Sequence, residues 1–433
     1  MNKKRSAFSG KIGYVLSAAG ASVGLGNIWR FPYLAAKYGG GIFLLVYIIL
    51  ALTFGYTMIV AESALGRMTR KSPVGAFRSF AKGKKVGWLS FGGWINAIIP
   101  VLIVPYYSVI GGWVVKYLFE YIRGNGSKLA EDGYFSGFIS NGGATEICFV
   151  IFCMFTLVII YAGVQNGIER VSKIMMPILI VLSVIIAIYS VTRPGAIEGV
   201  KYFLVPNVKN FSWMTVVAAM GQMFYSLSIA MGILVTFGSY MRKDTSIEDS
   251  TRNVEIFDTA IAMMAGLMII PAVFAFSGGD PDTLQAGPSL MFITIPKVLA
   301  NMGFGTAVGI LFFVLVLFAA VTSSIALTES AVSTFEDELG WGRKKATVLT
   351  GVIMIALGTL SCLGYGPLDF VKIIGMQFLD FFDFLTNSVM MPIAALMTSL
   401  LVSRVIGVDK IEEEIRHGES AFRRKKIFVV MIK

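Results

Sequence analysis

Histidine is almost missing from this chain, and cysteine is scarce. The 433 residues include 1 His and 3 Cys. The histidine, His417, lies in the charged stretch K-I-E-E-E-I-R-H-G-E, which excludes histidine-dependent catalysis within the apolar parts of the chain. Cys148, Cys153 and Cys362 lie in apolar stretches, where we expect small buried hydrophobic side chains. Neither a disulfide nor a metal site is therefore expected from these residue types.

Charged residues are also few. They make up 15% of the chain, whereas an ordinary soluble domain contains about 25%. Hydrophobic residues make up 56%, and uncharged runs long enough to cross a bilayer recur along the chain. The runs cover residues 12–29, 42–61, 86–115, 147–164, 174–192, 210–241, 259–279, 298–328, 346–368 and 384–403. We therefore expect a polytopic protein that crosses the lipid bilayer ten times.

The net charge of +11 is spread unevenly over the loops. Lys and Arg gather in the loops on the side of the N-terminus, above all in the loop after the second run. That loop contains Arg67, Arg70, Lys71, Arg78, Lys82, Lys84 and Lys85. Because positive loops stay in the cytoplasm, we predict a multi-pass protein of the cell membrane with both ends cytoplasmic. Topology and contact with the lipid surface then account for the charge, and nucleic acid is not an expected partner.

The first run contains the stretch G-A-S-V-G-L-G-N-I-W-R-F-P, which begins at Gly20 and has further glycines at Gly24 and Gly26. Each glycine weakens a helix interior by about 1 kcal/mol. In lipid, unwound backbone persists only where it lines a cavity or holds a ligand. Exposed amides near Leu25 can hold a carboxylate, and freed carbonyls up to Val23 can hold a small cation.

A second stretch of this kind, G-Q-M-F-Y-S-L-S-I-A-M-G, lies in the middle of the sixth run and carries Ser226 and Ser228 near the bilayer centre. The first and sixth runs open two sets of five, and because five is odd the second set enters from the opposite side. The pattern favours an all-α membrane protein with two inverted five-helix repeats and interrupted first and sixth helices. The alternative is two glycine-rich helices that pack closely through small residues.

The predicted domain organisation is one transmembrane domain over residues 1–433. The first five-helix repeat covers residues 1–192, and the second, inverted repeat covers residues 193–405. Residues 406–433 form a charged cytoplasmic tail that ends in I-F-V-V-M-I-K. This ending is typical of the first turns of another hydrophobic helix, so we expect an eleventh helix that is truncated or absent.

Several motifs give the chain a family resemblance. The first stretch is followed by K-Y-G-G-G at Lys37, the sixth run contains G-Q-M-F-Y-S-L-S at Gly221, and A-A-V-T-S-S-I-A and F-E-D-E-L begin at Ala319 and Phe335. In this order they resemble the neurotransmitter:sodium symporter family, in its bacterial, leucine-transporter-like amino-acid branch. The resemblance covers the first to the tenth run. It implies that the protein is not an enzyme. The implied function is a sodium-coupled symporter that imports a neutral, hydrophobic or aromatic amino acid by alternating access.

The resemblance also implies two sodium sites. Site 1 would consist of the Ser22 carbonyl, Asn27, Ser226 and Asp258, completed by the substrate carboxylate. Site 2 would consist of the carbonyls of Gly20, Val23 and Ala319 with the hydroxyls of Thr322 and Ser323. Taken alone, the two adjacent hydroxyls of Thr322 and Ser323 would bond to their own helix backbone more often than to an ion. Asp258 stands where chloride-dependent animal members carry a neutral Asn, so chloride is not an expected requirement.

The implied substrate site lies between these ions. Its residues are Ser22, Gly24, Leu25, Gly26, Ile103, Tyr107, Tyr225, Ser226, Ser228, Met231, Ser323 and Leu327. The amides of Leu25 and Gly26 and the hydroxyl of Tyr107 would hold the carboxylate. Met231 departs from the aromatic residue of the leucine-type sites, and because methionine is pliable it favours larger hydrophobic or aromatic substrates.

Charged residues in the spans imply an outer gate. Arg30 follows the first interruption and needs a partner in the membrane. The tenth run offers Asp380 and Asp383 in F-L-D-F-F-D-F, and Asp383 matches the family better. A membrane enzyme could use the same two acids as a pair, because a spacing of three places them on one helix face. No second catalytic group converges on them, and an ion channel would need a continuous polar pore, whereas the polar residues cluster at one depth.

The resemblance implies an inner gate as well. Arg5 would pair with Asp337, supported by Tyr240. Phe8 stands where the family commonly has Trp, so this inner latch would be looser. Glu62, at the end of the second run, is implied to be buried and to accept hydrogen bonds from the unwound sixth helix.

Overall fold

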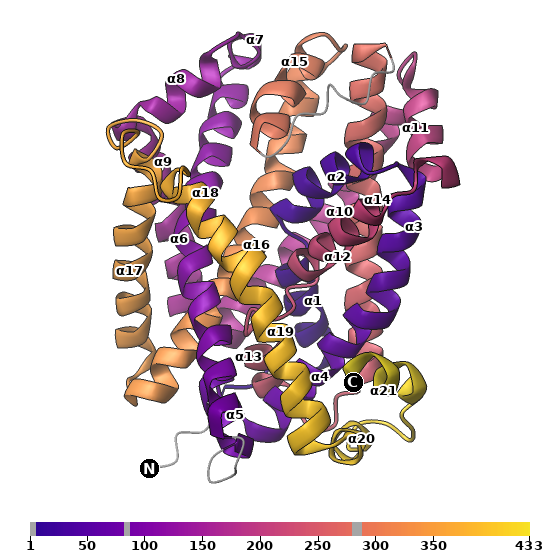
Figure 1. Ribbon diagram of the computed structural model, residues 1–433. Helices are drawn as coiled ribbons and strands as arrows, with labels where there is room; N and C mark the ends of the chain where they lie inside the picture. Colours follow the sequence, from indigo (N-terminus) through magenta and orange to yellow (C-terminus); the bar gives the residue numbers. More distant parts are fainter. Residues whose placement is uncertain (1–5, 82–86, 279–287) are drawn as a thin grey trace.

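A computed structural model describes residues 6–81, 87–278 and 288–433, and these parts of the chain are almost wholly helical (Figure 1). Within them, eight helices are long and apolar enough to cross a membrane. They are Gly41–Thr69, Gly87–Ile122, Gly142–Tyr161, Val164–Val191, Ile247–Ser277, Gly305–Leu339, Arg343–Leu363 and Phe378–Ile406. The described residues contain two isolated β-bridges and no extended β-strand. The predicted all-α membrane class is confirmed.

The first and sixth predicted runs are missing from that set because both are broken. The first run forms α1 (Lys11–Ser22) and then, after a gap, the π-helical turn η1 (Gly26–Arg30) and α2 (Phe31–Lys37). The sixth run forms α12 (Trp213–Ser226) and α13 (Ile233–Tyr240), separated by six non-helical residues. The glycine-rich stretches therefore interrupt their helices, as predicted.

The unbroken spans surround these two. They are built from α3 (Gly41–Leu50), η2 (Ala51–Gly55) and α4 (Tyr56–Thr69), α6 (Ser90–Ile122), α9 (Gly142–Tyr161), η4 (Val164–Glu169) and α10 (Arg170–Val191), α14 (Ile247–Ser277), α16 (Gly305–Leu339), α17 (Arg343–Leu363), and α18 (Phe378–Asp383), η8 (Phe384–Met390), α19 (Met391–Leu400) and η9 (Leu401–Ile406). Shorter helices are α5 (Pro73–Ala81), α7 (Gly126–Leu129), α8 (Tyr134–Ser140), α11 (Ala196–Leu204), η7 (Leu290–Thr294), α15 (Ile295–Ala300), α20 (Val408–Arg416) and α21 (Lys425–Ile432).

The broken helices lie at the centre of the bundle. Helix α1 packs against α14, α16 and α10, and α13 packs against α4. Every residue of α13 is buried. At Gly66 of α4, a Cβ atom would come within 2.0 Å of the Val235 carbonyl oxygen, so only glycine permits this backbone contact. The inner half of the sixth run is therefore pinned to α4.

The eighth span begins later than the sequence indicated. The uncharged run starts at residue 298, but the long helix starts at Gly305. The residues before it form the separate helix α15, which ends at Ala300, and a turn in which Phe304 has a φ of 59°. A left-handed residue cannot continue a right-handed helix, and the uncharged composition of the segment does not reveal the turn. The predicted start of this span is wrong.

The start of α1 and the C-terminal helix α21 lie towards the same face of the bundle, which we call the terminal face (Figure 1). Here the segment between the tenth span and α21, residues 407–424, packs against α4 and the start of α14, and we call it the strap. It contains α20, which contacts α4. The hydrophobic segment that follows is helical, as the sequence indicated, and α21 contacts α4 and η2.

Candidate functional site

The interruption of the sixth span contains strained backbone. Ser228 and Ala230 have φ angles of 54° and 60°, in the left-handed region that non-glycine residues rarely adopt. Their conformation is held by hydrogen bonds: the Ser228 hydroxyl donates to the Ala21 carbonyl at 3.0 Å, and the Ala230 amide donates to Glu62 at 2.8 Å. Glu62 is fully buried in α4. The two interruptions therefore hold one another, with the Glu62 carboxylate as a third support.

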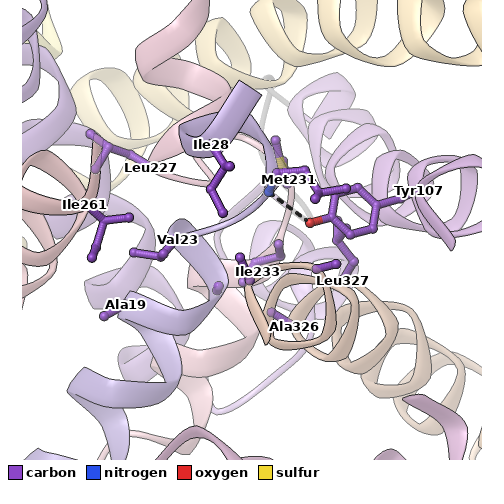
Figure 2. Close-up of a cluster of buried hydrophobic side chains, with 14 of the residues drawn as sticks. Ala19, Val23, Ile28, Tyr107, Leu227, Met231, Ile233, Ile261, Ala326 and Leu327 are labelled. Carbon is purple, nitrogen blue, oxygen red and sulfur yellow. Dashed lines mark hydrogen bonds between the residues drawn. The ribbon is translucent and has the colours of Figure 1, made fainter. Parts of the chain in front are cut away.

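A small cavity lies between the interruptions. Its lining is Ala21, Ser22, Gly24, Leu25, Gly26, Asn27, Ile103, Tyr107, Tyr225, Ser228, Met231, Ile233, Ser323 and Leu327. This includes every predicted substrate residue except Ser226. Figure 2 shows Tyr107, Met231 and Leu327 on one flank of the broken first span.

The cavity wall combines backbone polar groups with aromatic rings. The Leu25 amide donates to the Tyr107 hydroxyl at 3.3 Å, drawn as the dashed line in Figure 2, and the Gly24 amide donates to the Asn27 side chain at 3.1 Å. A Cβ atom on Gly26 would lie 2.4 Å from the Tyr225 ring, so this ring rests directly on the backbone. Amides just before η1 therefore border a pocket that also has apolar walls, which suits a ligand with an anionic group and an apolar body.

A fully buried carboxylate, Asp258 of α14, lies beside this cavity. One of its oxygens accepts hydrogen bonds from Asn27 Nδ2 at 2.8 Å and from the Ser226 hydroxyl at 2.6 Å. The other accepts from the Tyr47 hydroxyl at 2.5 Å. The structure thus brings together three residues of predicted sodium site 1. Tyr47 of α3 was not predicted, because a tyrosine in an apolar run has the pattern of an ordinary core residue.

The residues of predicted sodium site 2 also meet. The Ser323 hydroxyl lies 3.4, 3.1 and 3.4 Å from the carbonyl oxygens of Gly20, Ala21 and Val23. Thr322 donates back to the Phe318 and Ala319 carbonyls at 3.0 and 3.2 Å, and its side chain faces Gly20. Freed carbonyls of the first span and two hydroxyls of α16 therefore form an oxygen-rich cluster, the donor type that a hard cation needs.

The predicted outer-gate residues lie near one another. The Arg30 guanidinium lies over the Tyr225 ring, 5.3 Å from its centroid. Asp383 accepts hydrogen bonds from Tyr106 at 3.2 Å and from Asn387 at 2.6 Å, and Asn387 lines a groove with Arg30. Asp380 instead accepts from Tyr365 at 3.1 Å. In the described parts of the chain neither acid forms an ion pair with Arg30 within 4 Å, so the pairing of Arg30 with Asp383 stays a prediction.

On the terminal face, Tyr240 contacts an acid that was not predicted. Its hydroxyl donates to buried Glu329 at 2.7 Å, and Glu329 pairs with Arg343 at 2.5 Å. Asp337 accepts a hydrogen bond from the Ser72 amide at 2.6 Å. Arg5, its predicted partner, lies outside the described residues. Glu329 and Arg343 lie on different helices, so no local sequence pattern relates them.

Phe8 fills the position where the resemblance expects Trp. It is buried and makes edge-to-face contacts with the rings of Tyr14, Phe237 and Tyr240. Its amide also donates to the Tyr240 carbonyl at 3.1 Å. The smaller ring therefore still holds the segment before α1 against α13, through aromatic pairs that each contribute about 0.5–1.5 kcal/mol beyond their buried area.

The chain is similar in sequence to known sodium-dependent transporters. A model of the sodium:neurotransmitter symporter family matches residues 5–127 and 134–433. The chain is 36% identical over 417 residues to the uncharacterized sodium-dependent transporter YhdH of Bacillus subtilis, covering 96% of this chain and 91% of that protein. It is 33% identical over 417 residues to an uncharacterized sodium-dependent transporter of Haemophilus influenzae, covering 94% and 90%.

A solved structure is also similar. The crystal structure of MhsT in complex with L-phenylalanine matches with a TM-score of 0.88 and 36% sequence identity. The match covers 99% of this chain and 96% of that one. The described helices, including both interruptions, therefore follow the fold of a protein that was crystallised with an amino acid.

We expect Arg30 to be coupled to Asp383. Arg30→Glu and Asp383→Arg should each lower the unfolding temperature, because an unpaired buried charge costs about 3–5 kcal/mol, and the double swap should recover part of the loss. A double-mutant cycle on thermal unfolding in detergent measures this coupling. Asp380→Arg is the matched control and should show no coupling. If Asp380 shows it instead, our register of the tenth span is wrong by one turn.

Proposed function

The chain belongs to the sodium:neurotransmitter symporter family, and on this premise we propose that it imports a neutral, hydrophobic amino acid together with sodium by alternating access. The family's members are transporters, so the chain is a sodium-dependent membrane transporter and not an enzyme. One observation carries the finer proposal: the cavity between the two broken spans adjoins the buried carboxylate of Asp258. Amino acid and cation would therefore bind in contact with one another.

The polar groups of the cavity suit a zwitterion. The substrate carboxylate would lie on the amides of Leu25 and Gly26, replacing the weak bond between Leu25 and Tyr107 and gaining the Tyr107 hydroxyl. The ammonium group would lie against carbonyls of the two interruptions, near Ser22 and Tyr225, where unwound backbone supplies acceptors without helical partners. Both charged ends are then satisfied at mid-membrane without water.

Two sodium ions fit the oxygen clusters described above. Asn27, Ser226 and Asp258, with the Ser22 carbonyl, would hold the first ion, and the substrate carboxylate would complete its shell. The cluster around Thr322 and Ser323 would hold the second. Because the first ion and the substrate share a contact, each raises the affinity for the other, which is the thermodynamic basis of coupled transport.

The apolar part of the cavity favours a large side chain. Ile103, Tyr225, Met231 and Leu327 line it, and Ile233 adds a further aliphatic wall. The similar protein MhsT was crystallised with L-phenylalanine. Methionine at position 231 can repack around a ring as well as around an aliphatic chain. We infer that hydrophobic and aromatic amino acids are the substrates.

Transport would follow from rocking of the helices that carry the interruptions against the surrounding spans. Because Lys and Arg are biased towards the terminal-face loops, we expect this face to lie on the cytoplasmic side of the membrane. The Tyr240, Glu329 and Arg343 network lies on this side, and Arg30 with the start of the tenth span lies on the other. One side of the central site would open as the other closes.

Uptake into proteoliposomes tests the proposal. We expect an inward sodium gradient to drive accumulation of labelled L-phenylalanine, whereas a potassium gradient should not. Asn27→Ala removes a ligand from a desolvated cation and should abolish sodium-dependent uptake. Asn301→Ala, at an exposed turn, is the matched control and should transport normally. Normal sodium dependence in Asn27→Ala would contradict the site assignment, and sodium flux without amino-acid uptake would favour a channel.

Substrate size selection should depend on Met231. Met231→Phe places a rigid ring in the cavity, so it should cost tryptophan about 1–3 kcal/mol of binding free energy and alanine much less, because overpacking penalises bulky ligands. Competition of unlabelled amino acids against bound L-phenylalanine measures the difference. Equal losses for alanine and tryptophan would show that Met231 does not select by size.

We propose that chloride is not required, because Asp258 supplies a fixed negative charge at sodium site 1. At an effective dielectric constant of about 20, one opposite charge at 4 Å contributes roughly 4 kcal/mol to binding of a cation. The Tyr47 hydroxyl supports this role by orienting the carboxylate oxygen that faces away from Asn27. A mobile anion would then add nothing to the site.

Replacing chloride by gluconate should therefore leave uptake by the unmodified protein intact. Asp258→Asn should weaken sodium-coupled uptake in chloride-free buffer, because the fixed charge is lost, and added chloride should restore part of it. Initial uptake rates in matched chloride and gluconate buffers measure both effects. Collapse of wild-type uptake in gluconate would overturn the proposal, whatever the variant does.

A further inference from the structure

Helix α14 carries three buried acids on one face. Glu248, Glu255 and Asp258 are 5%, 1% and 0% exposed. Their spacings of seven and three residues place them on the same side of a helix. A carboxylate that is buried in this way needs partners. Asp258 has its partners in the proposed ion site, whereas Glu248 and Glu255 need partners from another part of the chain.

The strap supplies them. The Arg424 guanidinium pairs with Glu255, 3.2 and 3.4 Å from the two carboxylate oxygens, and lies over the Tyr56 ring at 4.5 Å. The amides of Arg423 and Arg424 donate to Glu248 at 2.7 and 3.1 Å, and the Tyr56 hydroxyl donates to the same carboxylate. Arg424 is therefore held by its backbone, its guanidinium group and an aromatic face at once.

The rest of the strap is fastened equally firmly. Arg67 of α4 is fully buried and donates to the Glu414 side chain at 2.7 Å, to the Glu414 carbonyl and to the Thr245 carbonyl at 2.6 Å. Glu419 accepts a hydrogen bond from the Glu248 amide at 2.8 Å. These contacts join the strap to α4 and to the start of α14, so the positive charge of Arg424 occupies a fixed position.

The partner of Arg424, Glu255, lies one helical turn from Asp258 of the proposed sodium site 1. Residues three apart on a helix have their Cβ atoms about 5–6 Å apart, so Glu255 is the direct neighbour of Asp258 on α14. Glu255 and Arg424 together carry no net charge. With the pair intact, the Glu255 charge is already neutralised, so Asp258 is the acid at the site itself that balances a bound cation.

We propose that Arg424 and Glu255 form a charge-balancing pair that sets the sodium affinity of site 1, so that the strap tunes the ion site from the terminal face. Both are positioning residues, because neither contacts the ion. The proposal rests on the function proposed above. It differs from a merely structural clamp in one respect: removal of the negative partner should weaken sodium binding, whereas removal of the positive partner should not.

The sodium dependence of L-phenylalanine binding tests this at constant ionic strength. Glu255→Gln leaves the positive charge of Arg424 unbalanced, so the half-saturating sodium concentration should rise at least threefold. In Glu255→Gln/Arg424→Gln it should return to within twofold of wild type. Arg424→Gln alone should leave it unchanged or lower it, because a positive charge near the cation is removed, and Arg424→Lys should behave as wild type.

The control acid is Asp249, on the same helix and paired with the neighbouring strap arginine, Arg423, at 3.3 Å. This pair is solvent-exposed and lies two turns further from Asp258, so Asp249→Asn should leave sodium dependence unchanged. An unchanged Glu255→Gln, or a double variant as impaired as Glu255→Gln, would overturn the proposal. If Glu255→Gln does not fold, a raised half-saturating sodium concentration in Arg424→Gln would overturn it.

The two proposals fail differently. Wild-type protein that binds L-phenylalanine without sodium dependence would refute the proposed function and this inference with it. Sodium-dependent binding that is unaffected by Glu255→Gln would refute the inference alone.

Discussion

Backbone amides and carbonyls cannot be left without partners in the hydrocarbon core of a membrane, and this constraint determines the centre of the protein. Two spans are broken there, so their freed groups need partners from elsewhere. Ser228 bonds to the Ala21 carbonyl, Ala230 bonds to Glu62, and Ser323 faces the carbonyls that end α1. Each break thus supports the other, and the groups that remain line a small cavity between the two breaks.

The same need for partners applies to the buried charge of Asp258. A fully buried carboxylate is stable only when it is hydrogen-bonded or paired, and Asp258 takes bonds from Asn27, Ser226 and Tyr47. Two further acids, Glu248 and Glu255, precede Asp258 on the same face of α14, and residues of the strap contact both. The centre and the terminal face are therefore joined by one helix whose buried charges are all partnered, which relates the proposed ion site to a segment after the tenth span.

The sequence predicted the parts of this arrangement that depend on composition or on local pattern. Charge scarcity indicated the membrane class, and the glycines around Gly24 and the stretch at Gly221 indicated the two breaks. The family resemblance then supplied the cavity residues. Tyr47 and the strap escaped prediction because their contacts join residues 211 and 169 positions apart, as for Tyr47 with Asp258 and Arg424 with Glu255. The start of the eighth span was misplaced because an uncharged turn before Gly305 has the same composition as the helix.

The central claim is that amino acid and sodium bind together between the two broken spans, and thermal unfolding with a panel of the twenty amino acids tests it most directly. A ligand stabilises the folded protein by RT ln(1 + [L]/Kd), so a micromolar binder at millimolar concentration contributes roughly 4 kcal/mol. We expect hydrophobic amino acids to raise the unfolding temperature in sodium buffer and to have little effect in potassium buffer. Equal stabilisation in both buffers, or none by any of the twenty, would contradict the account.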